Sequence, residues 1–223
     1  MYQGDNRHYF DVGYSALRCI RLALAVAEKG EVRRILDLPC GHGRVLRMLR
    51  AAFPQAELTA CDLDRDGVDF CASHFGAVPV YSAERPDQIP LQGPYDLIWC
   101  GSLFTHLDVD RWPGFLDAFR SHLGPGGVAV FTTHGRRVAQ RLREGRSTYG
   151  LTADQVAQML RDYDRSGFGY ARQPSPQGGD WGLSLSRPSW VLSHLEPRPD
   201  LDILLCAEQA WDDHHDVIAF KML

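Results

Sequence analysis

Apolar residues in the first 134 positions gather in short continuous runs, and segments with helical spacing of apolar residues lie between the runs. The runs predict β-strands at 33–38, 56–64, 77–83, 95–102 and 127–135. The segments around them predict helices at 14–29, 43–53, 65–75 and 109–123. Because the strands are apolar throughout and not at every second position, they indicate a parallel sheet that helices cover on both faces.

The regular alternation of strand and helix ends after residue 134. A helix is predicted at 152–163, with Thr152 as its N-cap residue. Residues 166–188 are rich in glycine, proline and aromatic residues, which predicts a long loop or an irregular hairpin. A short helix is predicted at 188–195, because a proline stands at its start.

Two further apolar runs close the sequence, at 201–211 and 216–223. The residues "DDHH" between them are too few for a helical crossover, so the two strands form an antiparallel hairpin. The pattern as a whole predicts an α/β fold: a doubly wound, seven-stranded and mostly parallel sheet whose last strand is antiparallel. We expect residues 1–223 to form a single domain, with residues 135–198 inserted as a lid between the fifth and sixth strands.

Composition and charge narrow the classes of partner. The chain has 44% hydrophobic and 23% charged residues, as in ordinary globular proteins, and its net charge of −4 argues against nucleic-acid binding. The polar N-terminal segment and the short apolar run at 22–27 argue against a signal peptide and a membrane span. Six cysteines without a CxxC pair fit reduced thiols. We therefore expect a cytoplasmic protein, and the sequence leaves its oligomeric state open, a homodimer included.

The turn after the first predicted strand carries the clearest candidate chemistry. Asp37 ends the strand, and Gly41 and Gly43 lead into the next helix, where backbone amides are able to approach a ligand. A dinucleotide fingerprint needs a third glycine, but Leu46 stands at that position, so a nicotinamide-dependent oxidoreductase is the disfavoured rival. The carboxylate of Asp37 suits an amino group better than a pyrophosphate. A ligand with an amine, a carboxylate and a ribose fits this turn.

Four segments of the sequence resemble the class I S-adenosylmethionine-dependent methyltransferases. "ILDLPCGHGR" is similar to the first motif of that family, and Asp62 in "TACDLD" stands where the family places the acid that binds the ribose. "YDLIWCGSLFTHLD" is similar to the family's fourth strand and the loop beneath the methionine moiety, and "LGPGGVAVFTTHG" to the turn and strand that follow. The resemblance covers roughly residues 32–134, and the closing hairpin matches the family's sixth and seventh strands.

The resemblance implies S-adenosylmethionine as the cofactor and a set of residues that bind it: Asp37, Pro39, Cys40, Gly41, Gly43, Asp62, Leu63, Ser82, Glu84, Cys100 and Gly101. Two positions depart from the family pattern. Pro39 replaces a frequent glycine, and Ser82-Ala83-Glu84 stands where many members place an adenine-binding aspartate, so the adenine contact stays open between Ser82 and Glu84. The alternative is structural: Asp37 as a cap within the turn, Asp62 as an ordinary strand-end acid, and Glu84 as a solvated one.

Histidines supply the candidate catalytic groups. Methyl transfer to a hydroxyl needs a general base, and histidine has a suitable pKa without large tuning. His106 follows the fourth strand, His134 ends the fifth, and His214 and His215 occupy the turn between the last two, so they meet at one edge of the sheet. We take His106, His134 and His215 as the candidate bases, against a capping or hydrogen-bonding role for each. We expect no metal, because consecutive residues such as "DDHHD" rarely form a coordination sphere.

The segments "YGLTADQV", "SGFGYA" and "WDDHHDVIAFK" resemble a bacterial methyltransferase group found among glycan and natural-product enzymes. That resemblance implies O-methylation of a saccharide or another hydroxylated small molecule. N-methylation of a small-molecule amine and a non-catalytic S-adenosylmethionine-binding role are the alternatives. The sequence thus predicts a small-molecule or saccharide partner, with no nucleic acid and no membrane.

Overall fold

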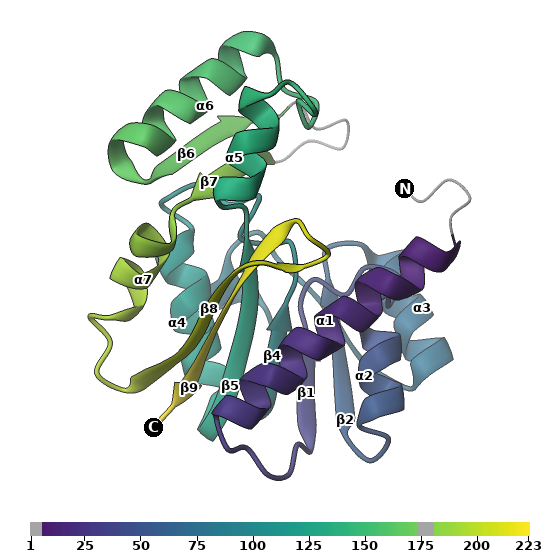
Figure 1. The fold of residues 1–223 in the computed structure, drawn as a ribbon. Helices are drawn as coiled ribbons and strands as arrows, with labels where there is room; N and C mark the ends of the chain where they lie inside the picture. The colour runs from purple at the N-terminus through teal and green to yellow at the C-terminus, as the bar shows by residue number, and fades with distance from the viewer. Residues whose placement is uncertain (1–5, 174–180) are drawn as a thin grey trace.

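The structure is a computed structural model, which describes residues 6–173 and 181–223. Its centre is a seven-stranded sheet in the order β3-β2-β1-β4-β5-β9-β8 (Figure 1). The strands from β3 to β5 pair in parallel, and β9 runs antiparallel to both β5 and β8. This arrangement confirms the predicted fold class. The strand bounds are β1 Arg34–Asp37, β2 Glu57–Asp62, β3 Val78–Tyr81, β4 Tyr95–Cys100, β5 Leu123–Thr133, β8 Leu201–Trp211 and β9 His215–Met222.

Neighbouring strand residues point to opposite faces of the sheet, and here both faces carry apolar side chains. Helices therefore cover both faces. Ile35 and Leu97 join one buried cluster with α1 (Asn6–Val26), α2 (Leu46–Ala52) and α3 (Arg65–Phe75). Leu36 and Ile98 join a second cluster with α4 (Trp112–His122) and α7 (Pro188–Leu195). A short 3₁₀ turn, η1 (Pro86–Gln88), precedes β4.

Most element bounds follow the sequence pattern, with two main exceptions: the helix at 136–143 was not predicted, and α1 starts earlier than predicted. It begins at Asn6 and not near residue 14, because its first turns extend beyond the apolar stripe that packs on the sheet. Phe10 in these turns is 44% exposed, and an Arg7–Asp11 ion pair at 3.7 Å joins successive turns. Hydrophobic periodicity therefore detected the packed part of the helix and missed its solvated start.

The segment between β5 and β8, residues 134–200, is called the insert below. It contains α5 (Arg136–Arg143), α6 (Ala153–Ser166), β6 (Phe168–Arg172) and β7 (Gly182–Ser186), and these elements share a small core of their own. β6 and β7 pair antiparallel, so the hairpin alternative for this region is confirmed in its described residues. Thr152 caps α6 as predicted: its Oγ1 accepts from the Gln155 N–H, and the Gln155 side chain accepts from the Thr152 N–H.

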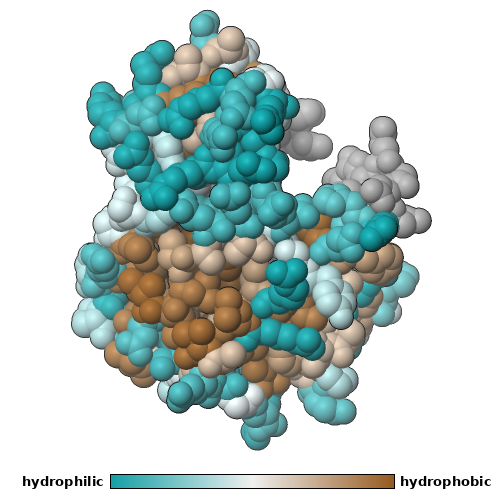
Figure 2. All heavy atoms as spheres, viewed as in Figure 1, coloured by the Kyte–Doolittle hydropathy of each residue, from teal (hydrophilic) through white to brown (hydrophobic). Residues whose placement is uncertain are grey.

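In the insert, α5, α6, β6 and β7 lie at the carboxyl edge of the sheet, at the top of Figure 1, whereas α7 lies beside α4. Backbone hydrogen bonds attach β7 to that edge: Ser184 N–H donates to the Thr105 carbonyl, and Ser186 N–H to the His134 carbonyl, both at 2.8 Å. Figure 2 shows a hydrophilic outer surface on the insert, whereas hydrophobic residues gather lower down, on the main lobe. Within the described ranges, every helix is too short or too polar to cross a bilayer.

Candidate active site

The turn from β1 to α2 takes a conformation that favours glycine. Gly41 and Gly43 have φ angles of 48° and 75°, in the left-handed region. A Cβ atom on Gly43 would lie 2.5 Å from the Phe75 ring, so α3 packs directly against the turn. A Cβ atom on Gly41 would meet nothing within 4 Å, which leaves this side of the turn open for a ligand.

Asp37 lies at the start of this turn and is 1% exposed. Neither carboxylate oxygen has a hydrogen-bond partner among the residues that the structure describes. Burial raises the pKa of Asp37 well above its usual value, and the nearby Cys71 and Asp62 raise it further. A buried carboxylate without a partner is costly, so this position fits a cationic group supplied by a ligand. The amino group of S-adenosylmethionine is such a group.

Asp62 ends β2 and supports the same turn. One of its oxygens accepts the Gly41 N–H at 2.7 Å, and the other accepts the Asp64 N–H at 3.0 Å. Carboxylate oxygens retain lone pairs after such bonds, so they are still able to accept from ribose hydroxyls. Leu63 follows with a side chain that is 57% exposed. The structure thus places both predicted aspartates at one turn, and Asp62 has a structural role there.

The remaining predicted cofactor residues lie around this turn with different environments. Contact with Cys71 and burial raise the pKa of the Cys40 thiol, and burial raises that of Cys100, so both thiols stay protonated. Pro39 is half-buried before Gly41. A Cβ atom on Gly101 would lie 2.9 Å from the indole nitrogen of Trp99, which gives this glycine a packing role.

The adenine position stays open between two residues. Ser82 is half-buried, and its N–H donates to the Asp62 carbonyl at 2.8 Å, which holds it beside β2. Glu84 is exposed. Both are near the end of β3, at the edge where the aspartates lie.

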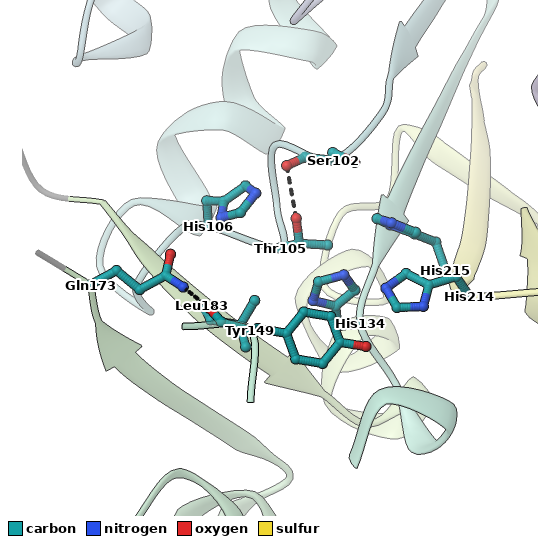
Figure 3. Close-up of a pocket in the computed structure, with 9 residues that line it drawn as sticks. All are labelled: Ser102, Thr105, His106, His134, Tyr149, Gln173, Leu183, His214 and His215. Atoms are coloured by element: carbon teal, nitrogen blue, oxygen red, sulfur yellow. Dashed lines mark hydrogen bonds between the residues drawn. The ribbon is translucent and has the colours of Figure 1, made fainter. Parts of the chain in front are cut away.

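A cavity of about 270 Å³ lies between the sheet edge and the insert (Figure 3). The loop after β4, the end of β5, the insert and the β8–β9 turn all contribute to it. It is lined by Ser102, Thr105, His106, His134, Tyr149, Gln173, Leu183, His214 and His215. The three histidines predicted as candidate bases therefore meet at one pocket, together with His214.

His106 has a defined protonation state. Its Nδ1 lies 2.7 Å from the Gly182 carbonyl oxygen, and its ring stacks on Trp181 with centroids 4.1 Å apart. A carbonyl oxygen accepts hydrogen bonds and never donates them, so Nδ1 carries the proton and Nε2 holds the free lone pair. Burial lowers the pKa of His106 below its usual 6.5, so the ring is neutral at pH 7.

His134, His214 and His215 form a cluster on the other side of the pocket, which we call the histidine trio (Figure 3). The ring centroids lie 4.6 Å (His134–His215), 4.9 Å (His214–His215) and 5.1 Å (His134–His214) apart. Burial lowers the pKa of all three, that of His214 to about 4, and the charges of neighbouring histidines or arginines add to this effect. The trio is therefore neutral at pH 7.

Each ring of the trio has a different hydrogen-bonding environment. His215 Nδ1 lies 3.3 Å from the Thr132 hydroxyl, and His214 Nδ1 accepts from Arg141 at 2.7 Å. His134 Nδ1 is buried and has no partner within the described part of the chain. Asp216 accepts from the Gln209 N–H and does not orient His215, as the alternation of strand side chains predicts.

Sequence reasoning did not select His214, Tyr149 or Arg141 as site residues. The one sequence feature that could have indicated His214 as a site residue was the short turn that contains it. Asp212 and Asp213 both adopt left-handed backbone angles there, which brings the two following imidazoles to the same pocket. Tyr149 and Arg141 come from the insert, where no local pattern indicates which side chains reach the sheet edge.

Comparison with known proteins supports the class that the geometry indicates. Residues 36–129 match the family model described as a methyltransferase domain. A malonyl-[acyl-carrier protein] O-methyltransferase of Halalkalibacterium halodurans is 30% identical in an alignment of 134 positions, which covers 57% of this chain and 48% of the relative. This chain thus matches about half the length of that curated relative.

Two solved structures share the fold. An S-adenosylmethionine-dependent methyltransferase from Clostridium acetobutylicum aligns with a TM-score of 0.64 and 16% identity, over 94% of this chain and 91% of that one. The plantazolicin methyltransferase BpumL, in complex with S-adenosylhomocysteine (SAH), aligns with a TM-score of 0.66 and 13% identity, over 98% of this chain and 86% of that one. The chain thus has the fold of S-adenosylmethionine-dependent methyltransferases, and its residues 36–129 match a methyltransferase domain. These matches support the enzyme class and the cofactor predicted from the sequence.

Proposed function

We propose that this chain methylates a hydroxyl oxygen of a small molecule, a saccharide included, with His106 as the general base. The observation that carries the proposal is the hydrogen bond from His106 Nδ1 to the Gly182 carbonyl. It fixes the tautomer so that Nε2 is the basic atom of a ring that lines the pocket. A base of this kind suits an acceptor that must lose a proton during transfer.

The cofactor supplies an electrophilic methyl group on a sulfonium. Asp37 would bind its amino group, and Asp62 its ribose hydroxyls, while the open side of the turn at Gly41 leaves room for its backbone. The pocket holds the acceptor, and the insert forms part of its wall, which helps to align the acceptor for in-line displacement. His106 Nε2 then takes the proton of the acceptor hydroxyl.

The pocket favours a hydroxyl over a carboxylate as the acceptor. A carboxylate acceptor has already lost its proton at pH 7 and needs no base, whereas the described pocket presents neutral imidazoles. The cavity of about 270 Å³ is near the lower end of ligand pockets, which begin at about 300 Å³, so it suits a small acceptor or one ring of a larger one. The curated relative is named as an O-methyltransferase, which agrees with transfer to oxygen.

The test is methyl transfer from isotope-labelled S-adenosylmethionine to a panel of hydroxylated, amine and carboxylic acceptors. We expect hydroxylated acceptors to react and His106→Gln to lower kcat by about 10²- to 10⁴-fold, with SAH affinity unchanged. Because burial lowers the pKa of His106 from its usual 6.5, wild-type kcat/KM should be level at pH 6.5 and above, and its acid limb should lie at lower pH. The glutamine variant should lack this acid limb.

His74→Gln is the matched control, because His74 is exposed on α3 and outside the pocket. It should keep wild-type rates and the wild-type pH profile. Methylation of amines with no reaction of hydroxylated analogues would contradict the proposal. So would a glutamine variant at position 106 with full activity.

A further inference from the structure

We propose that the histidine trio binds one divalent transition-metal ion, such as Zn²⁺. His134, His214 and His215 each offer one nitrogen, and these three nitrogens lie within 4.8 Å of one another. Imidazole is a common ligand for this class of ion. The proposal departs from the expectation drawn from "DDHHD", because that expectation considered consecutive residues of one turn.

The antiparallel pairing of β5 with β9 supplies the missing ligand. Thr133 lies opposite Asp216 in this pairing, so the next residue of each strand end places His134 beside His215. The β8–β9 turn then adds His214. His214 in the turn, His215 at the start of β9 and His134 just after β5 form a convergent set that no single segment of the sequence contains.

The trio has two properties that a metal site needs. Its imidazoles are neutral at pH 7, so an ion would not have to displace protons from imidazolium groups. His134 is 5% exposed, and its Nδ1 has no hydrogen-bond partner within residues 6–173 and 181–223. The His134 ring lines the pocket together with the two other imidazoles, so the three rings converge on one space.

Binding requires a modest contraction of the cluster. Nitrogens that each lie about 2.0–2.1 Å from a tetrahedral Zn²⁺ are about 3.3 Å apart, which is closer than the 4.8 Å limit of the trio. Three protein ligands leave one coordination position open toward the cavity, as in catalytic zinc sites.

Arg141 competes with the ion. Its guanidinium donates to His214 Nδ1 at 2.7 Å, so the proton of this neutral ring is on Nε2. Coordination through Nδ1 must displace Arg141, and coordination through Nε2 must displace that proton. The contact therefore gives a specific expectation: removal of Arg141 strengthens metal binding.

The open position gives the ion a role in the proposed reaction. An acceptor hydroxyl bound there would have a lowered pKa, and its proton would pass to His106 Nε2 across the pocket. This role rests on the proposed function, whereas metal binding by the trio does not.

The test uses the full chain after dialysis against a chelator, titrated with Zn²⁺ by calorimetry and with Co²⁺ by ligand-field absorption. We expect one equivalent to bind and to raise Tm. His134→Ala and His215→Ala should each weaken binding by at least roughly 100-fold. Arg141→Met should tighten it by roughly fivefold or more, and His74→Gln should match the wild type.

Absence of stoichiometric metal binding to the wild-type chain would overturn the inference. So would His134→Ala and His215→Ala variants that bind the metal as tightly as the wild type. If these variants fail to fold, X-ray absorption at the zinc edge of the loaded wild-type protein counts the imidazole ligands directly, and fewer than three would also overturn it. SAH titration of the same samples separates the two proposals. Metal binding without SAH binding contradicts the proposed function alone, and the reverse result contradicts the metal site alone.

Discussion

Asp37 combines deep burial with two carboxylate oxygens that lack a partner within the described residues. Burial raises its pKa well above the usual 3.8, so the unliganded protein favours the protonated acid. A bound amino group would reverse this preference, because an adjacent cation stabilises the carboxylate. Cofactor binding should therefore release a proton from this residue.

We predict that Asp37→Asn separates cofactor binding from stability. The amide has the same shape but no charge to pair with an amine, so SAH affinity should fall at least roughly tenfold. Stability should not fall, because the wild-type folded state resists ionisation of Asp37 while the unfolded chain ionises above pH 3.8. This group thus lowers wild-type stability as pH rises from 3.8 toward the raised pKa, and the asparagine variant lacks that loss.

Calorimetric titration with SAH and denaturant unfolding at pH 4 and pH 7 measure the two effects. The stability of the variant relative to the wild type should increase between the two pH values. Unchanged SAH affinity would contradict the assignment of Asp37 to the amino group. Asp69→Asn, on the exposed side of α3, is the matched control.

Asp96 shows how one side chain joins elements that are distant in the sequence. It is on β4, and it accepts from Lys29 Nζ at 2.9 Å and from the N–H groups of Arg33 and Arg34 at 2.8 and 3.0 Å. Burial raises its pKa, but these hydrogen bonds outweigh burial and leave the pKa below its usual value. The carboxylate therefore ties the connection between α1 and β1 to the middle of the sheet.

We predict that Asp96→Ala destabilises the protein by about 1–3 kcal/mol, because it removes three partners from one carboxylate. Since the pKa of folded Asp96 is lowered, its stabilising effect is present above the unfolded pKa and is lost as pH falls through the folded one. The difference between variant and wild type in urea unfolding should thus shrink below pH 4. Asp87→Ala removes an exposed ion pair with Arg85 and should change nothing measurable, and equal effects of the two variants would refute this view.

Elements whose ends depend on local chemistry were predictable from the sequence. α3 spans residues 65–75 and α7 residues 188–195, as predicted, because Gly76 adopts the left-handed angle after one and Pro188 begins the other. The turn at Gly41 and Gly43 was predictable for the same reason. Pairing between distant strands was not, because local periodicity does not indicate which residue of β5 lies opposite which residue of β9.

In the candidate site too, features that depend on local sequence were predictable, and features that depend on contacts between distant residues were not. The sequence placed His106, His134 and His215 at one edge of the sheet, since parallel strands end together. It did not reveal that His134 lies within 4.6 Å of the His215 ring, because that distance depends on strand register. Nor did it reveal that a carbonyl of β7 fixes the tautomer of His106, because the insert folds through contacts between distant residues.

The insert has a separate core but is fastened to the main sheet at the pocket. Ser184 donates from its hydroxyl to the Phe104 carbonyl at 2.8 Å, and its N–H bonds to Thr105, so β7 is held against the loop after β4. Trp181, just before β7, stacks on His106 and is 45% exposed. The pocket proposed for the acceptor is thus built jointly by two parts of the molecule, whereas the turn proposed for the cofactor belongs to the main sheet.

This division predicts a selective effect of Trp181→Ala. Loss of the stack should let His106 rotate and water enter, so the acceptor KM should rise and kcat should fall by roughly tenfold. SAH affinity and Tm should stay at wild-type values, because the indole is 45% exposed and does not contact the turn at Gly41. Steady-state kinetics, SAH calorimetry and thermal melting check these expectations, with Ile203→Ala on the exposed edge strand β8 as the control. A parallel fall in SAH affinity would show that the insert also shapes the cofactor site, and the two halves of the active site would then not be separable.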